Sequence, residues 1–148
     1  MTSGRRGVAL TPMETRPAVI VRTAVLADEL GYEIFSVPEG WGLDAVPVLT
    51  EIALRTARIS LASGILSVWG RTPATLAMTA ATLQEVSMGR YVLGLGASTR
   101  ALAEGFHDVP FEHPVGKLRD TVTGVRALLA GLPARLSQVQ AARALPLG

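Results

Sequence analysis

The hydrophobic pattern of the chain switches repeatedly between the period of a strand and the period of a helix. Apolar runs typical of buried strands lie at residues 7–10, 33–37, 58–66 and 91–95. Apolar residues at helical spacing follow each run, over residues 16–31, 44–56, 72–89 and 118–131. Strands that alternate with helices through short joints predict an α/β fold with parallel strands and right-handed crossovers.

The length of the chain limits which parallel fold it can form. A complete (β/α)8 barrel has about 250 residues, whereas this chain has 148. Four strand–helix units predict either a small open doubly wound sheet or part of a barrel. We expect these units to occupy residues 1–131, and residues 132–148, which are rich in alanine, to form a loosely attached helical tail.

Composition narrows the classes of protein further. Aromatic residues make up only 5% of the chain, so the core must consist of Ala, Val, Leu and Ile. The absence of cysteine excludes a disulfide framework, a thiolate metal site and a cysteine nucleophile. No apolar run approaches the length that spans a bilayer, and we expect a cytoplasmic protein with no membrane association. The net charge is +2 and the arginines are scattered, which predicts no nucleic-acid binding.

Ligands of parallel α/β folds bind beyond the carboxyl ends of the strands, and this rule selects four loops. The first offers Met13 and Glu14, and the others cover residues 38–44, 63–71 and 94–107. We expect all four loops to lie on one rim of the fold.

Several residues of these loops have both a functional and a structural interpretation. Glu39 could orient a ligand or accept a proton, or it could cap a helix. Gly96 lies in a turn whose amides could approach an anion or a flat ring, or which could simply be a tight connection. Trp41 and Trp69 could flank a flat ligand or cover the edge of a core.

The remaining polar residues give little support to hydrolysis or metal catalysis. His107 and His113 are six positions apart on an irregular segment, which is poor spacing for a metal pair. Either could be a general acid or a solvated loop residue. No serine lies in the context of a nucleophile elbow. We therefore expect redox chemistry carried by a bound cofactor.

Four ordered segments resemble the luciferase-like monooxygenase superfamily, and within it the branch that uses the deazaflavin coenzyme F420. These segments are VLADELGYE (25–33), SVPEGWGLDA (36–45), RTPATLAMTAATLQEVSMGRYVLGLGAS (71–98) and AEGFHDVPFEHP (103–114). The similarity extends from about Val8 to Ala130.

The resemblance implies a (β/α)8 barrel, of which this chain supplies the N-terminal half, with a cofactor at the rim. It implies hydride transfer between C5 of F420 and a small organic substrate, with an FMN-dependent monooxygenase as the alternative. It also implies a cis peptide bond between Gly64 and Ile65 behind the ring. The implied cofactor contacts are Glu39, Trp41, Gly64, Ile65, Gly96, Ala97 and Ser98.

Two positions depart from the family pattern. Several F420-dependent relatives have histidine after the acidic residue of the second loop, where this chain has Gly40. They also have glutamate in the fourth loop, where Thr99 stands. The resemblance therefore assigns no catalytic acid or base. Because the family's later strands fall beyond Gly148, a non-catalytic half-barrel that acts as a binding subunit is a second hypothesis.

Assembly follows from the same incompleteness. We expect the central strands to be apolar on both faces, through Ile59, Leu61, Val92, Leu93 and Leu95. A half-barrel with such strands would leave its inner side chains in water. The sequence therefore predicts that the chain is not a stable monomer, but a homodimer or one half of a complex with a partner chain that completes the barrel.

Overall fold

The computed structural model describes residues 6–131. The strands are β1 (Gly7–Ala9), β2 (Ile34–Val37), β3 (Ser60–Ser63), β4 (Leu66–Ser67), β5 (Tyr91–Val92) and β6 (Leu95–Gly96). The helices are α1 (Pro17–Glu29), α2 (Ala45–Arg55), α3 (Pro73–Val86), α4 (Arg100–Gly105) and α5 (Pro114–Leu129). The alanine-rich tail expected over residues 132–148 lies outside the described residues.

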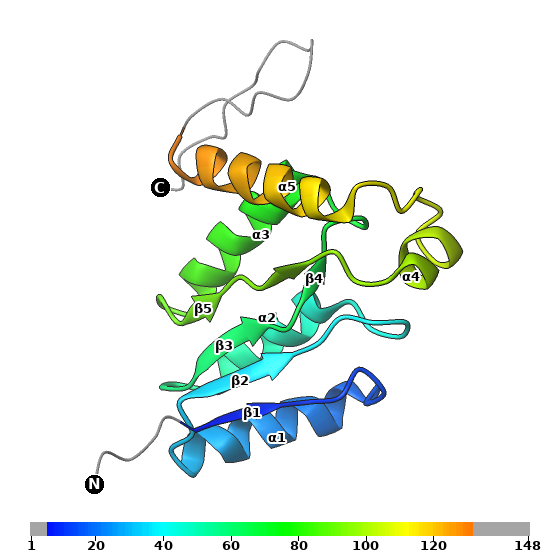
Figure 1. Cartoon of the computed structure of the whole chain (residues 1–148). Helices are drawn as coiled ribbons and strands as arrows, with labels where there is room; N and C mark the ends of the chain where they lie inside the picture. Colours follow the sequence, from blue (N-terminus) through cyan, green and yellow to red (C-terminus); the bar gives the residue numbers. More distant parts are fainter. Residues whose placement is uncertain (1–5, 132–148) are drawn as a thin grey trace, which may run out of the picture. The chain divides into compact units, whose positions relative to one another are not determined.

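A parallel sheet in the order β1-β2-β3-β5 forms the centre of the first of two compact units (Figure 1). This unit contains residues 6–66 and 82–94, and the second contains residues 67–81 and 95–131, so the boundary falls within α3. Strand β4 pairs with β6 in a separate two-stranded sheet. The predicted α/β class and parallel strands are therefore confirmed.

The helix boundaries follow the local signals in the sequence. Asp44 caps α2 because its carboxylate accepts a hydrogen bond from Val46 N at 2.9 Å. Thr72 does the same before α3, where its hydroxyl accepts from Thr75 N at 3.2 Å. Gly31 follows α1 with a φ of 74°, a left-handed conformation that favours glycine. These three residues explain why the helices begin and end where the sequence predicted.

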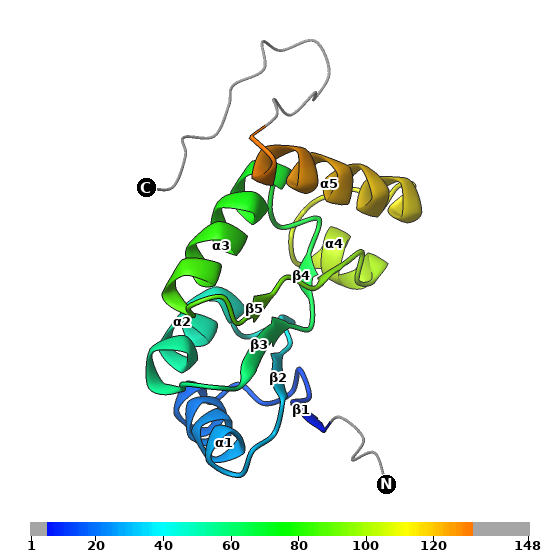
Figure 2. The same cartoon turned by 90° about the vertical axis from the view of Figure 1, so that its left-hand side faces the viewer.

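Helices α1 and α2 cover one face of the four-stranded sheet (Figure 2). Phe35, Val37 and Leu61 point into this side and are fully buried. Ile20 of α1 and Ile52 of α2 are buried as well. Burial of each such side chain contributes about 1.5–3 kcal/mol.

The opposite face of the sheet carries small side chains and two exposed apolar ones. Because side chains alternate along a strand, the residues that point this way are Gly7, Ala9, Ile34, Ser36, Ser60, Ala62 and Val92, here called the open face. Ile34 is 36% exposed and Val92 is 49% exposed.

The expectation that the central strands are apolar on both faces is wrong for Leu93 and Leu95, which lie outside the four-stranded sheet. Ile59 and Leu61 are buried on the helix side, whereas Leu93 and Leu95 are only half-buried. Of the five residues named for the two faces, Val92 is the one that lies exposed on the open face.

Two predicted strands are also shorter than expected. The run 58–66 ends as a strand at Ser63, because the main chain leaves the ladder at Gly64 and Ile65 before it pairs again in β4. The run 91–95 divides between β5 and β6. The six-residue helix α4 was not predicted, since it is too short to show a helical period; Thr99 caps it.

Arg90, just before β5, fastens the start of β3 to the end of α2. Its guanidinium donates to the carbonyl oxygens of Ala53, Thr56, Ile59 and Ser87 at 2.8–2.9 Å, and to the Thr56 hydroxyl at 3.0 Å. All five N–H donors of a guanidinium are therefore used. A compact ammonium group cannot reproduce this planar set of bonds.

We expect Arg90→Lys to lower the free energy of unfolding by about 2–3 kcal/mol, because several main-chain carbonyls lose a charged donor. Chemical denaturation followed by circular dichroism measures the change. Arg126→Lys, at an exposed position of α5, is the matched control and should change stability by less than about 0.5 kcal/mol. Equal denaturation midpoints for the two variants would show that the Arg90 bonds contribute nothing specific.

Candidate functional site

The loop after β2 brings Glu39 against the end of β3. The main-chain N–H of Glu39 donates to the Ile65 carbonyl oxygen at 3.3 Å. Its side-chain Oε1 accepts from Ala45 N, the first residue of α2, at 3.3 Å. The side chain of Glu39 therefore caps α2, which is one of the roles expected for it. Its main chain also connects the loop after β2 to the end of β3. Trp41, in the same loop, is 54% exposed.

At the end of β3 the main chain leaves the strand ladder at Gly64 and Ile65, a segment here called the excursion. The peptide bond between Gly64 and Ile65 is cis, as expected. Gly64 is exposed and Ile65 is half-buried, so this main chain is accessible from solvent. Gly64 N donates to the Val37 carbonyl oxygen at 2.8 Å. A Cβ at Gly64 would collide with the Ser36 hydroxyl, which explains why glycine stands there.

The loop after β6 belongs to the second unit and is fixed by Trp69. The indole Nε1–H of Trp69 donates to the Ala97 carbonyl oxygen at 2.6 Å. Trp69 is 9% exposed and packs with Phe111, their ring centroids 5.3 Å apart. Ser98, the next residue of the loop, is exposed and has a φ of 52°. A left-handed serine is uncommon and is often found at functional sites.

The predicted site residues thus fall into two groups. Glu39, Gly64 and Ile65 meet in the first unit, where Trp41 also lies, and Ala97 meets Trp69 in the second, beside Gly96 and Ser98. Trp69 is a core residue of the second unit, which agrees with the expectation that it covers the edge of a core. That all of them surround one cavity stays a prediction.

One residue that is not among the predicted cofactor contacts lies next to Gly64 in the first group. Ser63 is 3% exposed, and its hydroxyl bonds to Tyr91 and to both main-chain polar groups of Gly94. The sequence offered one signal for this role, which is a serine at the end of an apolar strand. A hydroxyl that is buried there requires hydrogen-bond partners.

The other polar candidates are engaged in local structure. Glu14, in the loop after β1, accepts hydrogen bonds from Arg16 Nε at 2.8 Å and Nη2 at 2.6 Å. The bonds from Arg16 lower the pKa of Glu14 to about 2, which makes it a poor proton acceptor at neutral pH. His107 lies against Gly70, where an added Cβ would be 2.9 Å from the imidazole Cε1. Within residues 6–131 no three His, Asp or Glu side chains form a cluster that could hold a metal.

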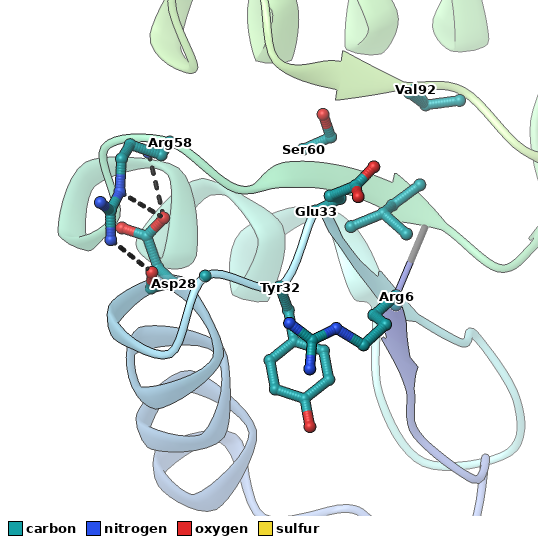
Figure 3. A pocket seen from close by; sticks show the side chains of 10 residues that line it. Arg6, Asp28, Tyr32, Glu33, Arg58, Ser60 and Val92 are labelled. Atoms are coloured by element: carbon teal, nitrogen blue, oxygen red, sulfur yellow. Dashed lines mark hydrogen bonds and ion pairs between the residues drawn. The ribbon is translucent and has the colours of Figure 1, made fainter. Parts of the chain in front are cut away.

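A pocket of about 680 Å³ lies at the opposite edge of the sheet, where the strands begin (Figure 3). It is lined by charged and aromatic residues and by part of the open face: Arg6, Asp28, Tyr32, Glu33 and Arg58, with Gly7, Gly31, Ile34, Ser60 and Val92. Its cations are already engaged: Arg6 lies over the Tyr32 ring at 5.7 Å, and Arg58 Nη2 donates to the Asp28 carbonyl oxygen at 2.7 Å. In barrel folds this edge serves stability, and the chemistry lies at the carboxyl ends.

Asp28 anchors the loop between α2 and β3 beside this pocket. Its carboxylate accepts from the main-chain N–H groups of Ala57, Arg58 and Ile59 at 2.7–3.1 Å. Burial alone would raise the pKa of Asp28, but these hydrogen bonds outweigh it, and the pKa lies below its ordinary value of 3.8.

The parallel sheet and the exposed strand-end loops define an α/β protein of the type that binds ligands at the carboxyl ends of its strands. The luciferase-like monooxygenase family matches the chain over residues 1–143, and the chain belongs to this family. None of the helices within residues 6–131 is long and apolar enough to cross a membrane.

The chain spans about a third of the length of the curated relatives it matches. A protein of Mycobacterium tuberculosis named as a coenzyme F420-dependent oxidoreductase is 34% identical over 104 residues, which are 70% of this chain and 30% of the relative. The 5,10-methylenetetrahydromethanopterin reductase of Methanolobus tindarius is 28% identical over 113 residues, 76% of this chain and 34% of the relative.

Two solved structures share the fold. The coenzyme F420-dependent tetrahydromethanopterin reductase of Methanopyrus kandleri superimposes with a TM-score of 0.78 at 25% identity, over 90% of this chain and 42% of that one. The oxygenating constituent of 3,6-diketocamphane monooxygenase from Pseudomonas putida, in complex with FMN, gives 0.79 at 18% identity, over 95% and 44%. The second likeness concerns the fold alone.

We expect Asp28→Asn to be less stable than the wild type at neutral pH, because an amide cannot replace a carboxylate that accepts from three amides. Since the folded-state pKa is lowered, the contribution of Asp28 is present above 3.8 and is lost as the pH falls through the folded-state pKa. The difference in unfolding free energy should therefore shrink in acid, as measured by denaturation at several pH values. A difference that does not depend on pH would contradict this role; Glu29→Gln, at an exposed neighbour, is the control.

Proposed function

We propose that the chain is the N-terminal half, residues 1–131, of an F420-dependent oxidoreductase of the luciferase-like family. In this proposal four βα units form half of a (β/α)8 barrel, and hydride moves to or from a small organic substrate in the cytoplasm. The proposed cofactor contacts are Glu39, Trp41, Gly64, Ile65, Gly96, Ala97 and Ser98.

The observation that carries the proposal is the contact between two strand-end loops through the hydrogen bond from Glu39 N to Ile65 O. Beside it, the exposed backbone at Gly64 offers a surface with no side chain in the way. The exposed, left-handed Ser98 offers a hydroxyl at the end of another strand. Bare backbone of the kind seen at Gly64 suits a flat ring.

The identity of the cofactor is supported by the relatives. The curated relative at 34% identity and the structure at 25% identity both carry F420 in their names, whereas the FMN complex is similar in fold alone. When bound, F420 would accept or supply a hydride at C5 of its ring. The task of the chain's own residues would be to hold that ring and exclude water. FMN is the alternative cofactor.

Three polar residues that the structure describes in the strand-end loops are already engaged in local structure. Glu39 caps α2, Glu14 is held by Arg16, and Thr99 caps α4. We therefore assign residues that bind the cofactor, and we assign proton transfer to none of Glu39, Glu14 and Thr99.

Titration of the purified chain with F420 and, separately, with FMN tests the proposal through the fluorescence of each ring. We expect F420 to bind more tightly than FMN. Binding of FMN alone would favour the monooxygenase alternative, and binding of neither would contradict the enzyme hypothesis for this chain.

Gly96→Leu should abolish binding with little change in melting temperature. Gly116→Leu in α5, where an added Cβ finds only an ordinary contact, is the size-matched control.

A second candidate function, a binding subunit without catalysis, is favoured by the open face. On that face Ile34, in the interior strand β2, and Val92, in the edge strand β5, are both partly exposed. We propose that this face is covered in the assembled protein, either by a second copy of the chain or by a partner chain that completes the barrel.

We expect the purified chain to behave in light scattering as a species larger than its monomer mass of 15.5 kDa, because burial of Ile34 and Val92 favours association. Ile34→Ser combined with Val92→Thr should shift the population toward monomer, whereas Met78→Ser, at an exposed position of α3, should not. A monodisperse 15.5 kDa species that resists dilution would contradict the assembly.

A further inference from the structure

The Ser63 hydroxyl is used to its full hydrogen-bonding capacity. It accepts from Gly94 N at 2.8 Å and from the Tyr91 hydroxyl at 3.1 Å, and it donates to the Gly94 carbonyl oxygen at 2.9 Å. A serine hydroxyl has one proton and two lone pairs, so these three bonds saturate it. Because Tyr91 and Gly94 N both donate, the hydroxyl proton is directed to the Gly94 carbonyl oxygen.

This hydroxyl replaces the main-chain hydrogen bonding that is absent between β3 and β5 at this point. The regular pairing of β3 with β5 ends at Ala62 and Val92. Main-chain bonding resumes only where Leu66 N donates to the Gly94 carbonyl oxygen at 2.9 Å. Between these points the side chain of Ser63, rather than its main chain, satisfies both polar groups of Gly94. A Cβ at Gly94 would collide with the Ser63 carbonyl oxygen, so this close approach requires glycine.

The excursion at Gly64 and Ile65 is consequently held on both sides. Toward β2, Gly64 N donates to the Val37 carbonyl oxygen at 2.8 Å and the Ile65 carbonyl oxygen accepts from Glu39 N at 3.3 Å. Toward β5, the Ser63 hydroxyl and Leu66 N both bond to Gly94. Of the side chains in this set, Ser63 is the one that fixes the excursion toward β5.

We propose that Ser63, oriented by the Tyr91 hydroxyl, is a positioning residue that sets the backbone of Gly64 and Ile65 against the ring of the bound cofactor. The proposal rests on the function proposed above. It adds that the fit of the ring depends on a buried hydroxyl that does not itself touch the ligand. Removal of this hydroxyl leaves Gly94 N–H without its partner and frees the segment to shift.

The test compares Ser63→Ala with Thr56→Ala. Thr56 is also buried in the first unit, and its hydroxyl also bridges two groups, donating to the Ile52 carbonyl oxygen and accepting from Arg90. It lies before β3, at the opposite end of the strand from Ser63. Both variants should lose stability, so melting temperature serves as the common reference.

For Ser63→Ala we expect the dissociation constant for F420 to rise about tenfold, the effect of one unmade buried hydrogen bond. The absorption spectrum of the bound cofactor should move toward that of free F420. Hydrogen exchange without ligand should accelerate at the amides of Gly64, Leu66 and Gly94. Tyr91→Phe should change the same readouts in the same direction by less. Thr56→Ala should leave all three readouts at their wild-type values.

Equal dissociation constants and spectra for Ser63→Ala and the wild type would overturn the positioning role. So would unchanged exchange at the three amides. If the wild type binds neither F420 nor FMN, the proposed function fails and the ligand part of this inference fails with it, while the exchange data still decide whether Ser63 holds the segment. The two failures are therefore distinguishable.

Discussion

The Asp28 carboxylate and the Arg90 guanidinium hold the loop that leads into β3, and the position of β3 in the sheet depends on this loop. The main-chain N–H groups of residues 57–59 donate to the Asp28 carboxylate. The carbonyl oxygens of Ala53, Thr56 and Ile59 accept from the Arg90 guanidinium. A loop of this kind would otherwise leave polar backbone groups unsatisfied next to the core, which is costly. Because Asp28 lies in the last turn of α1 and Arg90 precedes β5, these two residues connect α1, the α2–β3 loop and the start of β5 within the first compact unit.

The two edges of the sheet therefore use different chemistry. Where the strands begin, charged side chains with several hydrogen bonds fasten the connections, and the two arginines that line the pocket there are already engaged. Where the strands end, glycines and hydroxyls predominate: Gly64 and Gly94 allow close approach of backbones, and Ser63 and Ser36 fill the space beside them. Such an edge leaves main-chain surface exposed at Gly64. This division places stability at one edge and accessible backbone at the other, as expected for parallel α/β proteins.

The sequence predicted those features that depend on local chemistry. The helix boundaries near residues 31, 44 and 72 and the alternation of strands with helices are signalled by neighbouring residues, and the structure confirms them. The breaks at Gly64 and between Val92 and Leu95 could not be read from apolar runs, because an apolar run does not show where the backbone leaves the ladder. The resemblance to a family, rather than any pattern, gave the cis bond at Gly64–Ile65. The role of Ser63 depends on Gly94 and Tyr91, about thirty positions later in the chain, and such long-range partners are invisible to local pattern.

The chemistry of the open face bears on what covers it. The side chains of Gly7, Ala9, Ser36, Ser60 and Ala62 are small, and only Ile34 and Val92 are bulky. The interiors of closed barrels are filled layer by layer, to the density of an organic crystal. Two copies of this face set against each other would bring small residues onto small residues and leave gaps, each of which costs the contacts of the missing atoms. A partner face with larger apolar side chains would fill the same space. Association of identical copies is available to the purified chain, but a partner face of different sequence would fill the space beside the open face with fewer gaps.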